Sequence, residues 1–348
     1  MAKKPEVHYV TSPVFELLAA MFRVATPSQI QSDDVLMIKG KAIQLKQWVD
    51  QRRLLLPSNV KDELDVFFSY ESFLGLTLIR YAWETKAHQD VALFLKALTK
   101  LDAREWFAYF LHTGYGSGDS VDPNQLSTTT AAIDQSNLPE QEKWKLLYLY
   151  VHKEETKQRV IQLLRTFYGL ISDEFKYFLA QQQVVLDQVK DFAESLGADS
   201  FLMRVSKKYQ MPVNQMDEIV LAPSVFYDQW SFTTSTDSFC LFLFGIRQLP
   251  FEESAYSADK DKVDQAFKVL ADEKRLSIIR LLNRSPLYGY ELGKRLNLSN
   301  STISHHLSLL ASYDLVRPVR NENRVYYEVK NDQIKKLMEQ MLQSLIKD

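Results

Sequence analysis

The stretch NSTISHHLSLLASYDLV, residues 300–316, decides how the C-terminal part of the chain folds. Ile303, Leu307 and Leu310 recur at helical spacing, so a helix here would bury them as one apolar stripe. The other side carries short polar side chains and imidazoles, and no Asp, Glu, Lys or Arg occurs before Asp314. Because solvent-facing helices usually carry such charges, this side is typical of a helix that contacts another molecule.

The segments before this helix predict a helix-turn-helix. A helix is expected over residues 261–270, and Asp272 is suited to cap a second helix over residues 273–283. Pro286 begins a third, short helical segment, which ends at the four residues NLSN, 297–300. Two helices joined by so short a turn are typical of a motif whose second helix enters the major groove of DNA.

The segment after the quoted helix predicts a β-hairpin. In VRPVRNENRVYYEV, residues 316–329, two runs flank a polar Asn-Glu-Asn turn, and Val325, Tyr327 and Val329 are expected to share one face. A hairpin that directly follows a helix-turn-helix indicates a winged helix-turn-helix. A last helix is expected over residues 331–346.

Nine residues of the helix and the hairpin are our candidates for contact with double-stranded DNA. Short hydroxyls let a helix backbone approach base edges and phosphates, and an imidazole can reach a base. Residues 258–348 hold 16 Lys and Arg against 12 Asp and Glu, whereas the whole chain carries a net charge of −2. Arg317 is a further cation of the hairpin. The nine candidates are Asn300, Ser301, Thr302, Ser304, His305, Ser308, Arg320, Asn323 and Arg324.

The two adjacent histidines also allow a metal site or a pair of catalytic bases. Adjacent residues on a helix point about 100° apart, so His305 and His306 cannot easily bind one ion. We therefore expect His305 at the DNA-facing side. We expect His306 at the buried edge, with its second nitrogen hydrogen-bonded inside the domain.

The sequence of this region resembles the ArsR-type family of winged-helix transcriptional regulators. The similar segments are LADEKRLSIIRLL, residues 270–282, and STISHHLSLLASYDLVRPVRNENRVYYEV, residues 301–329. The family's Ser-x-His-Leu core matches Ser304, His305, His306 and Leu307. The resemblance covers about the last 90 residues. It implies a cytoplasmic homodimer on a pseudo-palindromic operator, with dimer contacts through the first and last helices of the domain.

The chain departs from the metal-sensing members of that family. Those members carry a cysteine pair in the helix before the recognition helix, or histidine and acidic ligands in the last helix. Here YGYELGKRL, residues 288–296, has no cysteine, and residues 332–348 have no histidine. Because soft and borderline metals need thiolate or imidazole ligands, we predict no metal site and no cofactor.

Residues 1–250 predict a large helical domain with a few short strands, so the expected fold class is mainly α. Helical periodicity runs through residues 1–112 and 138–196, and the polar segment between them predicts a loop. Strands are expected at residues 218–221, 224–227 and 238–244. The layout resembles large ArsR-type regulators that carry an N-terminal domain of uncharacterised role, followed here by the winged domain at residues 258–348.

Single residues of this N-terminal part give no sign of chemistry. Glu16 and Arg23 interrupt an apolar stretch, which predicts an amphipathic helix. Gly114–Ser120 lacks the Gly-Lys-Ser/Thr ending of a phosphate-binding loop, and Cys240, the single cysteine, sits in an apolar run that predicts a buried residue. The aromatic residues Trp83, Trp106, Phe107 and Phe110 favour core packing over the lining of a ligand cavity.

The sequence leaves the role of the N-terminal domain open between sensing a small-molecule or protein effector, contacting a partner and reinforcing the dimer. We find no paired carboxylates, no Gly-x-Ser-x-Gly and no His-Glu-x-x-His, so we expect no enzyme. No apolar run reaches 18 residues, so we also expect no membrane span. Two alternatives to a DNA-binding regulator remain: an enzyme with an appended winged helix, and a protein-interaction module.

Overall fold

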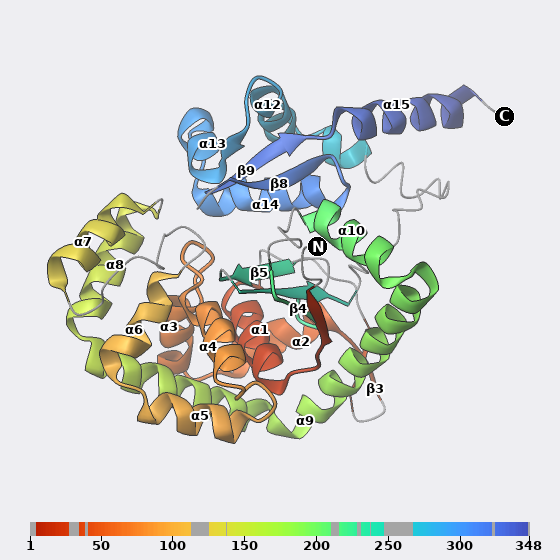
Figure 1. Cartoon of the computed structure of the whole chain (residues 1–348). Coiled ribbons are helices and arrows are strands. Elements are labelled where there is room, and N and C mark those ends of the chain that lie inside the picture. The colour runs from red at the N-terminus through yellow and green to blue at the C-terminus, as the bar shows by residue number, and fades with distance from the viewer. Residues whose placement is uncertain are drawn as a thin grey trace. The chain divides into compact units, whose positions relative to one another are not determined.

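The computed structural model of the chain describes residues 5–27, 35–38, 41–112, 125–136, 138–209, 216–227, 231–236, 238–246, 267–321 and 324–346. The chain divides into two compact units, unit 1 (Met1–Phe251) and unit 2 (Glu252–Asp348). Figure 1 shows that helices dominate and that strands are few, which confirms the fold class predicted from the sequence.

Unit 1 consists of helices and a small mixed sheet. Its helices are α1 (Pro13–Ala25), α2 (Leu45–Leu55), α3 (Ser58–Phe67), α4 (Leu78–Glu84), α5 (Val91–Lys100), α6 (Ala103–Leu111), α7 (Leu126–Gln135), α8 (Glu140–Val151), α9 (Lys153–Leu196) and α10 (Ala198–Tyr209), with the short 3-10 helix η2 (Leu74–Thr77). Its strands are β1 (Glu6–Tyr9), β2 (Val35–Ile38), β3 (Lys41–Gln44), β4 (Glu218–Ser224), β5 (Ser231–Ser235) and β6 (Phe239–Gly245). The sheet has the order β1-β4-β6-β5, in which only β5 runs antiparallel to its neighbour, and β2 and β3 form a separate hairpin.

The sheet differs from the sequence-based prediction at its edges. The expected strands at residues 218–221 and 238–244 correspond to β4 and β6, whose apolar runs are buried almost throughout. The strand expected at residues 224–227 was wrong, because the chain turns after β4 there. β5 was missed since its half-exposed Ser- and Thr-rich sequence acquires strand structure only by pairing with β6.

Other segments also differ from the prediction. The edge strand β1 and the hairpin of β2 and β3 lie in a region that was expected to be mostly helical. Part of the expected loop is helix α7, while residues 113–124, which include Gly114–Ser120, and residue 137 lie outside the described residues.

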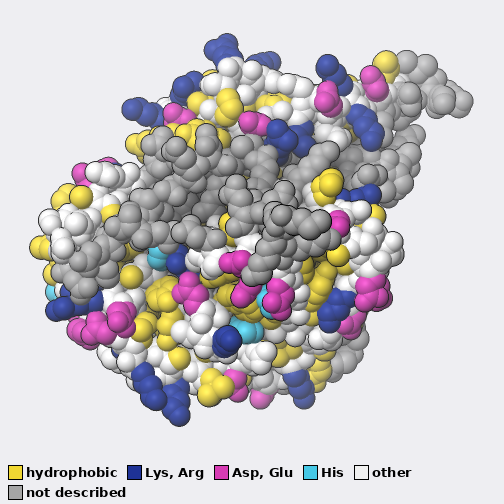
Figure 2. Space-filling model, in the orientation of Figure 1, with side chains coloured by type: hydrophobic (Ala, Val, Ile, Leu, Met, Phe, Trp, Pro, Cys, Tyr) yellow, Lys and Arg dark blue, Asp and Glu magenta, His cyan; other side chains and the backbone are white. Residues whose placement is uncertain are grey.

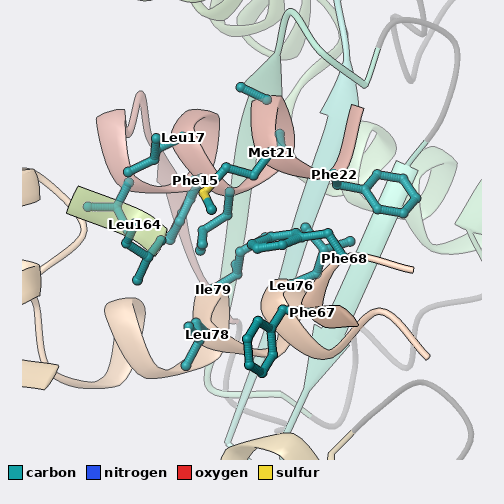
Figure 3. Packing of buried hydrophobic residues seen from close by; sticks show 14 of the residues in the cluster. Phe15, Leu17, Met21, Phe22, Phe67, Phe68, Leu76, Leu78, Ile79 and Leu164 are labelled. Carbon is teal, nitrogen blue, oxygen red and sulfur yellow. The ribbon is translucent and has the colours of Figure 1, made fainter. Parts of the chain in front are cut away.

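Helix α1 lies at the centre of the core of unit 1. Ser12 caps it by accepting a hydrogen bond from the Phe15 backbone N–H at 3.1 Å, and Pro13 occupies its first turn. Figure 3 shows Phe15, Leu17, Met21 and Phe22 of α1 among apolar side chains of other elements. Every residue from Val14 to Val24 is buried, so α1 is not the amphipathic helix expected from the sequence. Of the four aromatic residues named from the sequence, Trp106, Phe107 and Phe110 are fully buried in the same core, as predicted, and Trp83 is partly buried and packs against it.

The buried carboxyl group of Glu16 connects α1 to two distant segments. Its Oε1 accepts a hydrogen bond from the Val225 backbone N–H at 2.9 Å, and its Oε2 accepts one from Gln182 Nε2 at 2.6 Å. Burial raises the pKa of Glu16 to about 7, because removing water disfavours the carboxylate more than these hydrogen bonds favour it. Gln182 Oε1 has no partner among the described residues; with the amide reversed, it would accept the proton of a neutral Glu16.

Helix α9 is the longest helix of unit 1, with 44 residues. Apolar side chains of α9 contribute to two clusters, one around α1 and one around β4 and β6. The helix ends at Gly197, whose φ of 81° lies in the left-handed region, as the glycine there permits. Among the described residues, no helix is long and apolar enough to cross a membrane.

Unit 2 contains the predicted winged helix-turn-helix elements. They are α12 (Glu273–Leu282), β7 (Leu287–Tyr288), α13 (Gly289–Leu296), α14 (Asn300–Ser312), β8 (Val316–Asn321), β9 (Arg324–Val329) and α15 (Asn331–Ile346). Residues 267–270 are helical as well, and residues 261–266 of the first expected helix lie outside the described residues. The three strands pair antiparallel in the order β7-β9-β8, so the short strand β7 precedes α13, where only helix was expected.

The buried Glu16 predicts a specific pH dependence of the stability of unit 1. An unfolded glutamate titrates near 4.5 and the folded one near 7, so stability is fully present below pH 4.5 and falls as the pH rises towards 7. We expect Glu16→Gln, whose amide does not ionise, to remove a loss on the order of 3 kcal/mol between pH 4.5 and pH 8.

Urea unfolding followed by tryptophan fluorescence at both pH values measures this loss in the wild type and the variant. The exposed Glu154→Gln in the first turn of α9 is the matched control. Equal pH dependence in Glu16→Gln and the wild type would contradict the assignment of a neutral buried carboxyl group.

Candidate nucleic-acid interface

The turn between α13 and α14 is built from three residues. Asn297 adopts the left-handed conformation with φ 52° and ψ 47°, and the Leu298 backbone N–H donates to the Gly293 carbonyl at 3.0 Å. Ser299 then caps α14 by accepting from the Thr302 backbone N–H at 3.1 Å. The sequence already contained both signals, since Asn is the non-glycine residue best suited to such a turn and Ser is a preferred N-cap.

Gly293 allows the two helices to approach closely at this turn. A Cβ atom at this position would lie 3.0 Å from the Leu298 carbonyl oxygen and 3.1 Å from Asn300 Oδ1. A side chain here would push the turn and the first residue of α14 away. The candidate Asn300 therefore lies against α13, at the junction of the two helices.

The two sides of α14 are arranged as the sequence predicted. Ile303, Leu307 and Leu310 are buried in the core of unit 2, together with apolar side chains of α12 and α13. The polar residues of the other side are only partly buried. They are Thr302, Ser304, His305 and Ser308.

The other candidate residues are described less completely. The Thr302 hydroxyl lies 2.7 Å from Ser299 Oγ, so it also supports the helix start. Arg320 and Arg324 are placed in the backbone of β8 and β9, opposite Val325 and Asn321 respectively. The side chains of Arg320, Arg324 and Ser301 lie outside the described part, as does the whole of Asn323.

One cation of the β8–β9 hairpin, Arg317, is paired with a carboxylate of the same hairpin. Arg317 donates to Glu328 Oε2 at 2.8 Å across the strands, so it is engaged within the hairpin. Tyr327 and Val329 pack against the core of unit 2, as expected for one face of β9. Figure 2 shows further Lys and Arg side chains scattered over the visible face of unit 2.

His306 is buried at the edge between α14 and α12, with 9% of its surface exposed. Contrary to our expectation, its Nδ1 has no hydrogen-bond partner among the described residues. Burial lowers the pKa of His306, which the nearby carboxylate of Asp272 partly opposes. Asp272 caps α12, as predicted, by accepting from the Arg275 backbone N–H at 2.9 Å, and this hydrogen bond lowers the pKa of Asp272.

Comparison with known proteins agrees with this geometry. Residues 272–317 match the family described as "Bacterial regulatory protein, arsR family". The chain is 35% identical over 82 residues to the cadmium resistance transcriptional regulatory protein CadC of Listeria innocua, which covers 23% of this chain and 69% of that protein. The chain belongs to the arsR family. Its 35% identity over 72 residues to the transcriptional activator HlyU of Vibrio cholerae covers 21% of the chain and 67% of HlyU.

Solved structures are also similar to part of this arsR-family chain. A possible transcriptional regulatory protein of Mycobacterium bovis, fragment 1–100, is 26% identical, with 26% of this chain and 98% of that chain covered and a TM-score of 0.22. NolR of Sinorhizobium fredii is also 26% identical, with 28% and 96% covered and a TM-score of 0.22. In the described part of the chain, no group of three or more His, Cys, Asp or Glu side chains could hold a metal ion.

The left-handed Asn297 predicts how the turn responds to substitution. Asn297→Ala should destabilise the α13–α14 turn by about 1–2 kcal/mol, since a Cβ without a compensating side-chain hydrogen bond disfavours this conformation. Asn297→Gly should leave the turn nearly unchanged, because glycine adopts positive φ without strain. Amide hydrogen exchange of peptides from α13 and α14, read by mass spectrometry, measures the difference. Equal protection in the two variants would show that the conformation of Asn297 does not limit the turn.

Proposed function

We propose that this arsR-family chain is a DNA-binding transcriptional regulator that acts in the cytoplasm. The observation that carries the proposal is the uncharged, partly exposed polar side of α14, which lies within the region matched to the family. In this proposal α14 enters the major groove, where small side chains let its backbone come close to the base edges.

The candidate residues divide into three roles under this proposal. Ser304, His305 and Ser308 face the base edges and select sequence, together with Ser301 and Thr302 at the helix start. Asn300 holds the start of the helix against α13, close to Gly293. Arg320, Asn323 and Arg324 of the hairpin contact phosphates or the minor groove, where they add affinity with little sequence preference.

We further propose that the regulator binds a pseudo-palindromic operator as a homodimer. The apolar side chains Met338 and Leu342 of α15 are 50% and 59% exposed and lie one helical turn apart, while Leu337 is buried in unit 2. Such a stripe supports a two-fold contact between copies, with the helix that precedes α12 as the second contributor. Two-fold symmetry would then match two half-sites spaced by about one turn of DNA.

Unit 1 would regulate DNA binding by responding to a small-molecule or protein effector. An open surface hollow of about 340 Å³ lies between α4 and α6. Its polar groups bond to one another: Glu84 accepts from Arg80 Nε at 2.8 Å and from the Tyr109 hydroxyl at 2.8 Å. The carboxylate of Glu84 is therefore held in place by two neighbouring side chains.

Binding of the full chain to labelled DNA tests the proposal against its alternatives. Duplexes are selected from a random-sequence pool and titrated with the chain at several salt concentrations. A regulator enriches one site, which it binds with an affinity that falls as salt rises. A protein-interaction module binds no duplex in a salt-sensitive way, and an enzyme turns over substrate through isolated residues 1–250. Failure to retain any duplex would exclude the DNA-binding proposal.

The hairpin generates one prediction for that assay. Arg324→Ala should weaken binding to all duplexes by a similar factor and reduce the slope of log affinity against log salt by about one, because one phosphate contact is lost. Arg317→Ala is a suitable comparison, since Arg317 is engaged with Glu328. An unchanged affinity and slope in Arg324→Ala would show that the hairpin does not contact phosphates.

Helix α14 generates the complementary prediction. His305→Gln or Ser301→Ala should change which base pairs are preferred, at a cost of about 1–3 kcal/mol for the original site, because base contacts carry specificity. Ser312→Ala, at the exposed C-terminal end of α14, is the matched control. Repeating the selection with each variant measures the preference, and an identical selected site would refute base contact by that residue.

A further inference from the structure

His306 combines three features that a purely packed core residue rarely has together. Its ring is nine-tenths buried between α14 and α12, and its Nδ1 has no hydrogen-bond partner among the described residues. It is also the neighbour of His305, which we assign to the DNA-facing side of α14. The centroids of the two rings lie 6.0 Å apart. A change in the charge of His306 would therefore act directly on the placement of α14.

The surroundings of His306 favour its neutral form. Arg275 and Lys274 of α12 and His305 of α14 disfavour a positive charge on the ring, while Asp272 of α12 favours it. Burial has the largest effect and also disfavours the charge. The guanidinium of Arg275 is held in place, because its Nη2 donates to the Lys268 carbonyl at 3.3 Å and its Nε to the Val269 carbonyl.

Asp272 cannot fully offset these effects. Its carboxylate caps α12 by accepting from the Arg275 backbone N–H at 2.9 Å, so it is already committed to the start of that helix. The first turn of α12 adds a partial positive charge from the aligned dipoles of its peptide units. A proton on His306 is therefore stabilised better once the ring has moved out towards water.

We propose that His306 is a positioning residue that holds α14 against α12 in its neutral form, so that acidification loosens α14 and weakens DNA binding. This inference rests on the proposed function, because its readout is affinity for DNA. The sign follows from the lowered pKa: an unfolded or released histidine titrates near 6.5, and the packed one below it. The positioning is fully present above about pH 6.5 and is lost as the pH falls from there towards the lower, packed value.

The test compares the pH profiles of DNA binding by the full-length chain. The probe is a fluorescent duplex of about 30 base pairs, long enough for two half-sites one helical turn apart, selected from a random pool by the wild type at pH 7.5. We expect wild-type affinity to fall several-fold between pH 7.5 and pH 5.5, since each pKa unit of lowering permits a loss of up to about tenfold. His306→Gln, which does not titrate, should lose this fall while retaining binding at pH 7.5.

Ser312→Ala, at the exposed C-terminal end of α14, is the matched control on the same helix and should keep the wild-type pH profile. A merely structural role for His306 would lower the affinity of His306→Gln equally at every pH. An unchanged wild-type profile in His306→Gln would overturn the inference.

A second measurement covers the case in which His306→Gln does not fold. The chain has six histidines, so selective labelling allows NMR titration of each ring in the wild type. The inference requires the pKa of His306 to lie below the usual value for histidine and its ring signals to broaden as α14 loosens, and an ordinary histidine pKa would overturn it. If the wild type selects no duplex at any pH, the proposed function fails instead, whereas the titration of His306 still reports on its packing.

Discussion

The apolar stripe of Ile303, Leu307 and Leu310 is the contact on which unit 2 depends. These side chains are buried among residues of α12, α13 and the β8–β9 hairpin, so they fix the rotation of α14 about its own axis. Once that rotation is fixed, Ser304, His305 and Ser308 must face outward. Burial of three large apolar side chains contributes roughly 5–9 kcal/mol before chain entropy is counted, which no surface hydrogen bond of the polar side can match. Packing of the apolar stripe therefore determines which side chains of α14 face outward.

The sequence was sufficient for α14 because the signals for this helix are local. Ser299 marks its start and the stripe gives its period. β5 could not be found in the same way, since its strand structure comes from pairing with β6, which no local pattern reports. The strand expected at residues 224–227 failed for the opposite reason: its apolar side chains are buried in a turn and not in a strand.

Helix α1 shows where reasoning from charge patterns breaks down. Glu16 and Arg23 suggested a solvent-facing side, yet both are buried and the helix is enclosed on all sides. The structure accommodates Glu16 through the Val225 backbone N–H and Gln182, two partners more than 160 positions away in the chain. Such partners are invisible in sequence because hydrogen bonds over that separation exist only once the fold has formed. The exposure of the polar side of α14 could be predicted, because the residues that determine it are neighbours in sequence as well as in space.

The distribution of charge fits a regulator that discriminates between DNA sites. Residues 258–348 carry an excess of four positive charges, whereas the rest of the chain carries an excess of six negative ones. At physiological salt, charges act over about 8 Å, so DNA at the surface of the winged domain responds to the local positive excess. At longer range the whole chain is slightly anionic and attracts DNA little, which limits non-specific binding. The absence of charged side chains on α14 adds to this effect under the proposed function. When DNA of the wrong sequence lacks the base contacts, α14 has no cations whose attraction to phosphates could compensate for their loss. Under the proposed function, affinity depends mainly on the hairpin and sequence choice on α14.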